Sequence, residues 1–325
     1  MIISKTPFRI SFLGGGTDLP AHYRRAGGAV LSTTIDKYMY VAVNPRFEDT
    51  LRVAYTRTEI VESLDELQHE LVREALRLVG VKKGVEVVTI ADVPAGTGLG
   101  SSSSLTVGLL HALYAYTGKF VSRERLAREA CEIEIERLGH PIGKQDQYAA
   151  AYGGLNFIRF NSDDTVFVEP VICSPEVKKE LFDSLLIFYT GLRRSSGSIL
   201  WEQARRAEEK HGVLVRLSEL AEAGREAVGR GDLESFGLLL HEGWQLKRTL
   251  ASGISRPEID AWYETARAAG ALGGKILGAG GGGFLLLFCP VERKEAVRLR
   301  LSQFGLREFQ VAYEPQGSRI IYQDW

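Results

Sequence analysis

Cysteine is scarce in this sequence, and its placement excludes two kinds of scaffold. The 325 residues contain three cysteines, Cys131, Cys173 and Cys289, which lie far apart and form no CxxC pair. Disulfide frameworks and structural zinc sites are built from even or closely spaced sets of cysteines. We therefore expect free thiols, as is typical of proteins in a reducing compartment.

An excess of charge and a long apolar run are missing as well. The 40 basic and 41 acidic residues give a net charge of −1, so the chain lacks the basic footprint that binds nucleic acid or anionic membranes. No apolar run approaches the roughly 20 residues that span a bilayer. Lys5 and Arg9 interrupt the region where a signal peptide would have its apolar core. We expect a soluble cytoplasmic protein, either monomeric or dimeric, that binds neither nucleic acid nor membrane.

What is present fits an α+β protein of two domains. Apolar residues make up 45% and charged residues 25% of the chain, which are ordinary globular values. A domain usually has about 100–200 residues, and the strand-like and helix-like segments are grouped rather than alternating. We place a boundary between residues 161 and 180, which gives domains at 1–170 and 171–325.

Local patterns predict the individual elements. Alternating or continuous apolar residues predict strands at 2–13, 29–35, 38–43, 51–55, 85–90, 155–160, 165–168, 184–189, 275–277, 284–288 and 309–313. A turn at residues 36–37 is expected to join the second and third of these strands. Apolar stripes at helical spacing predict helices at 64–79, 101–116, 122–137 and 291–304, and three or four more between 196 and 269. A short helix of small residues is expected to end at Gly153.

Glycine is the one residue type in clear excess. The chain has 35 glycines among its 325 residues, against an average of about 7%, and they cluster at 14–16, 96–100, 153–154 and 278–283. Glycine occurs where a backbone needs a positive φ or must approach another group closely. Four such clusters in one chain predict a ligand that carries phosphates.

The loop at residues 94–104 is the best candidate for the phosphate site. Its sequence, PAGTGLGSSSS, leads from a predicted strand into a predicted helix, whose free N–H groups and dipole attract anions. A Walker loop would end in a lysine, which is absent here, and the GxGxxG at 278–283 precedes a strand rather than a helix. Simple capping of the helix would explain one serine and not four.

The predicted helix at 122–137 carries three glutamates that helical geometry separates. At about 100° per residue, Glu134 falls on the apolar face with Ala127 and Ala130, whereas Glu132 and Glu136 fall on the opposite face. A buried carboxylate must be paired or bind a metal. Glu134 is therefore either a metal ligand or the partner of a structural arginine.

Three motifs together resemble the GHMP kinases, the family of galactokinase and of homoserine, mevalonate and phosphomevalonate kinases. They are TPFRISFLGGGTD at 6–18, PAGTGLGSSSS at 94–104 and KILGAGGGGF at 275–284, in the order that the family has. The resemblance covers nearly the whole chain and implies phosphoryl transfer from ATP with Mg²⁺. It also implies a ribosomal-S5-like N-terminal domain, a ferredoxin-like C-terminal domain and a site between them.

Within this family, residues 14–18 and 143–154 are most similar to the sugar-1-kinases, and in particular to the D-glycero-D-manno-heptose 7-phosphate kinases. The implied reaction is phosphorylation of the anomeric hydroxyl of that sugar, and a fucose-like or galactose-like hexose is the alternative. Galactokinases carry a Glu-His pair where this chain has Gly15 and Gly16, which argues against galactose itself. A non-catalytic binding protein of this fold should have lost Asp146 or Glu134, yet both are present.

The resemblance also implies roles for single residues. It makes Asp146 the catalytic base, which spacing alone does not distinguish from a helix cap, and it makes Arg9 a basic neighbour of that base rather than a surface arginine. Glu134 would bind Mg²⁺, with Ser102, or else Ser101, as the hydroxyl ligand. The ATP phosphates would meet Pro94, Gly96, Gly98, Leu99, Gly100, Ser101, Ser102 and Ser103. The sugar would meet Gly15, Gly16, Thr17, Asp18, Gly143 and Lys144.

Two assignments keep a structural alternative. Asp18 follows the triple glycine and resembles the aspartate that binds sugar hydroxyls, but an Asx turn would use the same residue. Arg193 and Arg194 follow a predicted strand of the second domain. They could hold a substrate phosphate through paired hydrogen bonds, and a solvated pair is the alternative.

Overall fold

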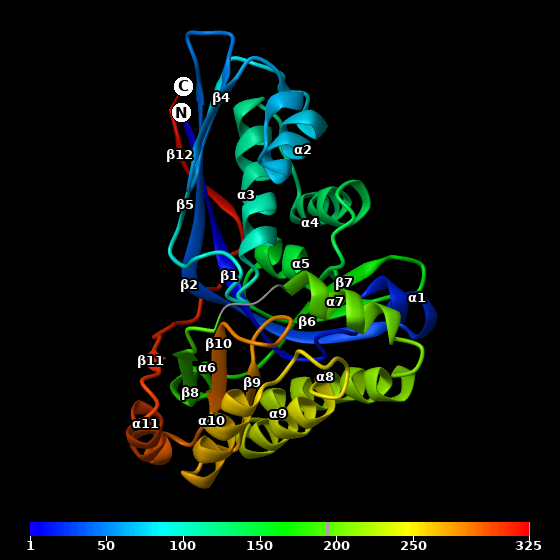
Figure 1. The fold of residues 1–325 in the computed structure, drawn as a ribbon, viewed down its shortest axis with the longest axis vertical. Coiled ribbons are helices and arrows are strands. Elements are labelled where there is room, and N and C mark those ends of the chain that lie inside the picture. Colours follow the sequence, from blue (N-terminus) through cyan, green and yellow to red (C-terminus); the bar gives the residue numbers. More distant parts are fainter. Residues whose placement is uncertain (193–195, 325) are drawn as a thin grey trace.

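Two β-sheets and the helices packed on them make up the computed structural model, which describes residues 1–192 and 196–324 (Figure 1). Within these residues the larger sheet has eight strands in the order β12-β1-β2-β5-β3-β4, with β6 paired to β2 and β7 paired to β6. Their bounds are β1 Ile2–Leu13, β2 Gly28–Pro45, β3 Leu51–Ala54, β4 Thr58–Val61, β5 Val85–Ala91, β6 Leu155–Phe160, β7 Val166–Pro170 and β12 Arg319–Gln323.

The smaller sheet comes from the second half of the chain. Its four strands lie in the order β11-β8-β10-β9, and all of their pairings are antiparallel. The bounds are β8 Leu185–Tyr189, β9 Gly273–Ile276, β10 Phe284–Phe288 and β11 Arg307–Glu308. Strand β10 is buried along its whole length, in agreement with the continuous apolar run that predicts it.

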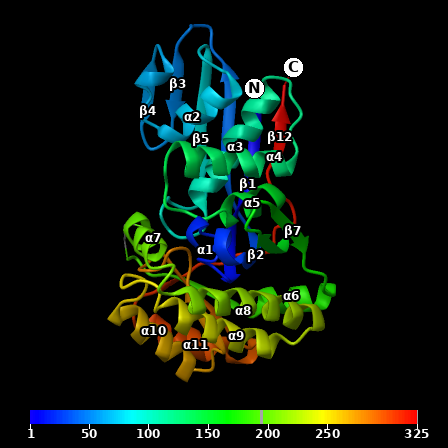
Figure 2. The same ribbon diagram turned by 90° about the vertical axis from the view of Figure 1, so that its right-hand side faces the viewer.

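Helices cover one face of the large sheet and connect it to the small one (Figure 2). Helix α3 packs on β1 and β2, with α2, α4 and α5 against it; α8 packs on β2 and on α9, which packs on β9. The bounds are α1 Pro20–Ala26, α2 Glu70–Val79, α3 Ser101–Tyr116, α4 Arg123–Cys131, α5 Gln145–Tyr152, α6 Pro175–Asp183, α7 Ser196–Arg205, α8 His211–Arg230, α9 Leu233–Lys247, α10 Pro257–Ala268 and α11 Lys294–Ser302. Short turns are η1 Leu64–Glu66, η2 Glu132–Arg137 and η3 Val291–Arg293.

Strand β2 corrects the prediction of two strands joined by a turn. It runs without a break through Asp36 and Lys37 and pairs with β1 on both sides of them. Pro7 of β1 pairs with Tyr38, but the next residue, Phe8, pairs with Ile35. Residues 36 and 37 are therefore a bulge, which bends a strand without ending it.

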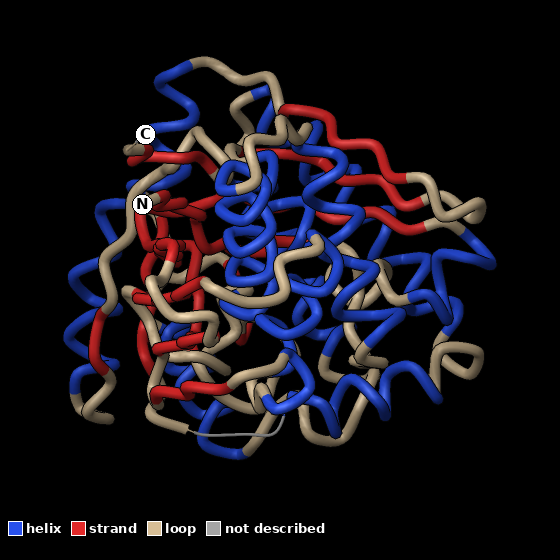
Figure 3. Tube along the Cα trace, turned by 90° about the horizontal axis from the view of Figure 1, so that it is seen from above, coloured by secondary structure: helices blue, strands red, loops and turns tan. Residues whose placement is uncertain are grey.

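The end of the chain also differs from the prediction. The prediction of a strand at residues 309–313 is wrong, because that segment forms only an isolated β-bridge between Tyr313 and Ile35. The last strand is instead β12, which pairs antiparallel with β1. Ile2 lies opposite Gln323 at one end of this pairing, and Lys5 lies opposite Arg319 at the other. The two chain ends consequently lie side by side in every view (Figures 1, 2 and 3). The division at residue 170 stays a prediction, although the final strand returns to the sheet of the first half.

The helix predicted at 122–137 changes its geometry partway. Ser122 caps α4 by accepting a hydrogen bond from the N–H of Arg125. After Cys131 the chain continues as a π-helical turn, η2, which ends at Arg137. Single π-turns inside helices are frequent at functional sites. No helix among the described residues has both the length and the apolar character needed to cross a membrane.

Candidate active site

Arg9 and Asp146 meet through two hydrogen bonds where α5 packs against β1. Arg9 lies in β1 and Asp146 in the first turn of α5. Arg9 Nε donates to Asp146 Oδ1 at 2.7 Å, and Arg9 Nη2 donates to Asp146 Oδ2 at 2.6 Å. The Arg9 side chain is buried, whereas the Asp146 side chain is 23% exposed. The pair therefore fixes the direction of a carboxylate that still has an open side.

The predicted phosphate loop is attached to the same arginine. Arg9 Nη1 donates to Gly98 O at 2.7 Å, and the backbone N–H of Arg9 donates to Leu99 O at 3.0 Å. A Cβ atom on Gly100 would lie 3.4 Å from Asp146 Oδ2, so the start of α3 runs beside the carboxylate. The structure thus brings together the residues predicted as base, basic neighbour and phosphate loop.

The four serines at the start of α3 do not cap the helix. Its N-cap residue is Gly100, in the left-handed conformation, and no side chain accepts a capping hydrogen bond. Ser102 Oγ donates to Glu134, and Ser104 Oγ donates to Pro7 O. The first N–H groups of α3 are consequently left without a capping side chain, as an anion site at a helix N-terminus requires. Pro94 and Gly96, on the outer part of the loop, are exposed.

The glycine cluster at 278–283 closes against the phosphate loop. A Cβ atom on Gly98 would lie 2.5 Å from Leu277 O, and one on Gly283 would lie 2.3 Å from Thr97 O. Both glycines have left-handed φ angles, +90° and +86°. Backbone therefore packs directly on backbone here, and both halves of the chain build the site.

Glu134 is fully buried in the π-turn η2. Ser102 Oγ donates to Glu134 Oε2 at 2.8 Å, and Gln147 Nε2 donates to Glu134 Oε1 at 3.0 Å. Burial raises the pKa of Glu134, and these hydrogen bonds act in the opposite direction. Glu132 is only partly buried and Glu136 is exposed, so the orientation predicted from the helical wheel is confirmed. Within the described chain, the partners of Glu134 are hydroxyl and amide groups, and no arginine pairs with it.

Glu134 and Ser102 offer the kind of oxygen ligands that Mg²⁺ prefers. Their two oxygens are 2.8 Å apart, close to the roughly 3.0 Å between neighbouring ligands of an octahedral ion with bonds near 2.1 Å. Among the described residues, no three His, Cys, Asp or Glu side chains gather into a metal cage. The donor set fits an ion held by one or two side chains together with waters and nucleotide phosphates.

Asp18 joins the two segments predicted to meet the sugar. Its buried carboxylate accepts hydrogen bonds from the N–H of Gly16 at 3.0 Å, from the N–H of Gln145 at 3.3 Å and from Gln145 Nε2 at 2.9 Å. A Cβ atom on Gly143 would lie 2.0 Å from Asp18 Oδ2, so no side chain fits there. Burial, and then the nearby Asp146, raise the pKa of Asp18. The triple-glycine turn and the start of α5 are thereby held together.

Two other predicted sugar contacts have structural partners. Thr17 Oγ1 donates to Ala29 O at 2.9 Å inside the glycine turn. Lys144 Nζ donates to Asp164 Oδ1 at 2.9 Å and lies 4.8 Å from the centre of the Tyr23 ring. A binding role for these two side chains stays a prediction. Arg193 and Arg194 lie outside the described residues.

The structure also shows a cluster of polar side chains that sequence patterns do not single out. Four buried side chains surround the triple-glycine turn, those of Ser11, Gln203, Lys247 and Lys275. Lys275 does carry a signal, because it is the one charged residue of the short strand β9, which is otherwise glycine and isoleucine. Lys247 ends an amphipathic helix, where basic residues are common, so its sequence position gives no hint.

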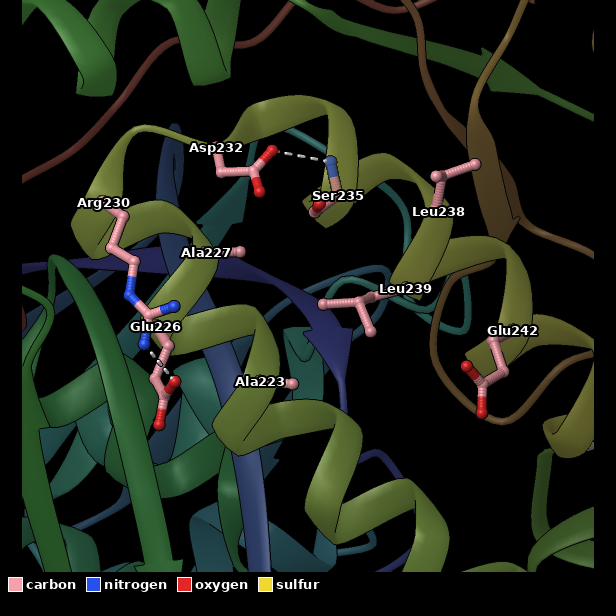
Figure 4. Close-up of a pocket in the computed structure, with 9 residues that line it drawn as sticks. All are labelled: Ala223, Glu226, Ala227, Arg230, Asp232, Ser235, Leu238, Leu239 and Glu242. Carbon is pink, nitrogen blue, oxygen red and sulfur yellow. Dashed lines mark hydrogen bonds and ion pairs between the residues drawn. The ribbon is translucent and has the colours of Figure 1, made fainter.

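A hollow of about 370 Å³ between α8 and α9 lies away from these residues (Figure 4). Its lining includes Arg230 and Glu226, which form an ion pair, and Asp232, which accepts a hydrogen bond from the N–H of Ser235. Glu242, which also lines the hollow, pairs with Arg216 of α8. The predicted catalytic residues lie instead where β1, α3 and α5 meet.

Comparisons with known proteins agree with this arrangement. The profile of the GHMP kinases N terminal domain matches residues 64–154, and that of the GHMP kinases C terminal domain matches residues 225–306. Together they match more than half of the chain. The chain therefore belongs to the GHMP kinase family, and it has the two-domain fold of that family.

Several relatives are sugar kinases, and others are mevalonate kinases. D-glycero-alpha-D-manno-heptose 7-phosphate kinase from Campylobacter jejuni is 29% identical, over 96% of this chain and 97% of its own length. Bifunctional fucokinase/GDP-fucose pyrophosphorylase from Arabidopsis thaliana is also 29% identical, over 94% of this chain and 31% of its own length. The crystal structure of a D-glycero-D-manno-heptose 1-phosphate kinase from Bacteroides thetaiotaomicron superimposes with a TM-score of 0.83 at 27% identity and covers both chains completely. These similarities identify the protein as an ATP-dependent sugar kinase.

Proposed function

We propose that this protein transfers the γ-phosphoryl group of ATP to the anomeric hydroxyl of D-glycero-D-manno-heptose 7-phosphate. The observation that carries the proposal is that Arg9 contacts both Asp146 and the phosphate loop. It puts a proton acceptor beside the place where the nucleotide phosphates would bind. The similarity to two heptose kinases over almost the whole chain supports the choice of sugar.

In this proposal Asp146 is the base. The anomeric hydroxyl gives its proton to the Asp146 carboxylate, and its oxygen forms a bond to the γ-phosphorus. The bond between that phosphorus and the oxygen bridging to the β-phosphate breaks, and ADP leaves. Arg9 fixes the direction of the carboxylate, and the N–H groups at the start of α3 bind phosphate oxygens.

Glu134 and Ser102 are the proposed Mg²⁺ ligands. When bound, the ion would neutralise charge on the β- and γ-phosphates. Gln147 holds the second carboxylate oxygen of Glu134, which fixes the direction of the first. Residues 94–103 complete the proposed nucleotide site, and use of ATP supports a cytoplasmic location.

The proposed sugar site lies on the surface that Asp18 holds together. Gly15, Gly16 and Gly143 form this surface beside Asp18. A fucose-like hexose is a second candidate substrate, because the plant fucokinase relative is as similar in identity as the heptose kinase. In the proposed two-domain arrangement, residues 1–170 contain the nucleotide-binding loop. Residues 171–325 contribute part of the backbone that packs against this loop.

The experiment is a screen of ADP release over a panel of phosphorylated and free heptoses and hexoses. We expect the highest kcat/KM for D-glycero-D-manno-heptose 7-phosphate, and phosphorus NMR of the product should show a new phosphate on the anomeric carbon. A higher kcat/KM for free fucose would replace the heptose with the second candidate. A product that carries the phosphate elsewhere would overturn the assignment of the anomeric hydroxyl.

A further inference from the structure

Two buried ammonium groups lie beside the triple-glycine turn. A Cβ atom placed on Gly15 would be 3.4 Å from Lys247 Nζ and 3.8 Å from Lys275 Nζ. The two lysines are only 5% and 4% exposed. They come from separate elements, since Lys247 ends α9 and Lys275 lies in β9. The fold therefore gathers two cations at one point under its surface.

Buried donors without a partner lie at the same point. Ser11 Oγ would be 3.5 Å from the same Cβ position on Gly15, and Gln203 Oε1 would be 3.4 Å from a Cβ on Gly16. Both side chains are more than nine-tenths buried. The Ser11 hydroxyl and the Gln203 amide nitrogen have no hydrogen-bond partner among the described residues. Unpaired buried donors are costly, so they indicate a ligand that accepts hydrogen bonds.

The charge of this cluster points to an anion. Lys275 Nζ donates only to the backbone carbonyls of Ser11 and Phe12, at 2.9 and 3.0 Å, and no carboxylate in the described chain forms an ion pair with it. Burial, followed by the neighbouring Lys247 and Arg9, lowers the pKa of Lys275 well below its ordinary value. Buried charges are stable when an opposite charge compensates them. An anion at this point would compensate the charge of Lys275, and Lys247, which donates to Gly278 O at 2.7 Å, lies beside the same point.

Glycine at position 15 leaves the polar atoms around it uncovered by a side chain of its own. Gly14 and Gly16 have φ angles of +81° and +106°, whereas Gly15 is outside the left-handed region. The nearest atom to a Cβ on Gly15 is 3.4 Å away, so neither backbone conformation nor packing requires glycine there. With glycine there, no side chain of residue 15 covers the ammonium groups of the two lysines.

The distance from the proposed base suits the far end of a sugar. Ser11 follows Arg9 by two residues in β1, without a register shift between them, so both side chains lie on the same face of the strand, about 7 Å apart. A sugar whose anomeric oxygen lies at Asp146, beside Arg9, would extend along this face. Its last carbon atoms would then reach Gly15.

We propose that Lys247, Lys275, Ser11 and Gln203 bind the phosphate group that the sugar acceptor already carries. This inference rests on the proposed function, because it assumes a phosphorylated sugar. It assigns the phosphate to a buried site over Gly15 and Gly16. It also explains why this chain has small residues where galactokinases carry a Glu-His pair.

The first test compares acceptors that differ only in this phosphate. For each variant, kcat/KM is measured with D-glycero-D-manno-heptose 7-phosphate and with the unphosphorylated heptose. In Lys247→Gln and Ser11→Ala, we expect the ratio of the two values to fall by about 10–100-fold, the size of one lost charge-assisted hydrogen bond. The loss should lie in KM for the phosphorylated sugar, while KM for ATP is retained. Lys179→Gln on exposed α6 and Ser302→Ala at the exposed end of α11 are the matched controls and should keep the ratio of the wild type.

An equal loss for both acceptors, or a rise of KM for ATP, would overturn the proposal, since the lysine would then act on the sugar ring, the transferred phosphate or the fold. Ser11→Ala guards against misfolding, because the Ser11 hydroxyl has no hydrogen-bond partner among the described residues to lose, and the melting temperature of this variant should match that of the wild type.

A second measurement separates this site from the choice of substrate. The probe is 1,5-anhydroglucitol 6-phosphate, which has a phosphate and no anomeric hydroxyl, and its binding is measured by calorimetry beside unphosphorylated 1,5-anhydroglucitol. We expect the wild type to bind the phosphorylated probe at least 10-fold more tightly, and Lys247→Gln to lose this preference. If the preference is found but heptose 7-phosphate is not phosphorylated, the proposed function fails and the phosphate site stands. If the wild type shows no preference, the phosphate site is wrong.

Discussion

Both carboxylate oxygens of Asp146 accept a hydrogen bond from the Arg9 guanidinium. These bonds fix the direction of the carboxylate and leave it able to accept a proton. Each carboxylate oxygen has a second lone pair, and the partial exposure of the side chain leaves an approach for the acceptor hydroxyl. An amide at this position keeps the size of the group but cannot accept the proton in the same way.

Asp146→Asn should therefore lower kcat by about 10²–10⁴-fold, the usual contribution of a general base. KM for ATP should change little, because Gly98 and the N–H groups of α3 remain in place. Steady-state rates with saturating ATP measure this, with Asp183→Asn at the exposed end of α6 as the control. A folded Asp146→Asn protein with normal kcat would remove Asp146 from the role of base.

Glu134 is buried, whereas Glu132 and Glu136 are more exposed. We therefore expect only Glu134 to affect how the enzyme uses Mg²⁺. Glu134→Gln should raise the Mg²⁺ concentration for half-maximal activity and lower kcat, whereas Glu132→Gln and Glu136→Gln should behave like the wild type, since surface changes usually alter stability by less than about 0.5 kcal/mol. Titration of activity with Mg²⁺ is the measurement. A large drop in melting temperature with an unchanged Mg²⁺ requirement would show instead that Glu134 is structural.

The raised pKa of Glu134 also predicts a dependence of stability on pH. Burial lifts its pKa above the ordinary value of 4.5, so above pH 4.5 the folded protein keeps this proton longer than the unfolded chain does. The free energy of unfolding should therefore fall as the pH rises from 4.5 through the raised pKa. Glu134→Gln removes this loss, and its melting temperature relative to the wild type should increase with pH, measured without Mg²⁺ between pH 4.5 and 8. A constant difference would mean that burial of this carboxylate has no titrating effect.

At the scale of elements, two glycine loops interlock across the site. Gly96 and Gly98 lie two residues apart and both have left-handed φ angles, +78° and +90°. They differ in their surroundings, because a Cβ on Gly96 would meet nothing within 4 Å while one on Gly98 would strike the carbonyl of Leu277. The phosphate loop is thus free on its outer side and fixed on its inner side.

This difference predicts unequal costs for the same substitution. Gly96→Ala and Gly98→Ala should each carry a backbone strain of roughly 1–2 kcal/mol, but Gly98→Ala must also displace the loop between β9 and β10. We expect Gly98→Ala to lower the melting temperature more and to weaken ATP binding at least 10-fold further. Equal melting temperatures and ATP affinities in the two variants would show that the contact between the loops does not shape the site.

Elements with a strong local pattern are the ones that the sequence predicts well. Helix α3 and strands β6 and β10 have the predicted bounds, because each is determined by its own burial. The bulge in β2 was missed, since it depends on how β1 aligns beside it. Helices α1 and α6 were missed as well, because they are short and mostly exposed.

The residues of the candidate site also differ in whether local sequence patterns can find them. Glycine loops and the helical face of Glu134 can be found from local patterns, and resemblance to a family adds Arg9 and Asp146. Lys247 and Gln203 could not be found, because each lies in an ordinary helix and becomes part of the site only when α7 and α9 pack near Gly15. Such a juxtaposition is a property of the folded chain and leaves no mark in local sequence.

At the scale of the whole molecule, the large sheet contains both ends of the chain. Strand β12 covers the edge of β1, and Ser318 just before it hydrogen-bonds to Thr6 and His111. An uncovered β1 would present unpaired backbone groups at a sheet edge, which promote aggregation.

Truncation after Gly317 should therefore lower the melting temperature by about 5 °C or more and increase aggregation during expression, although the truncation removes none of the proposed catalytic residues. Truncation after Gln323 leaves β12 intact and serves as the control, with melting curves and light scattering as the measurements. If both truncated proteins melt like the full chain, β12 contributes nothing to the stability of the sheet.

The pairing of β12 with β1 also sets an order of events during protein synthesis. The ribosome makes Ile2 long before its partner Gln323, so the edge of β1 stays uncovered until β12 has been synthesised. The proposed active site lies beside this same strand, through Arg9. A nascent chain would thus carry the residues proposed for phosphoryl transfer on an unfinished sheet, and the codons of β12 decide whether β1 is protected.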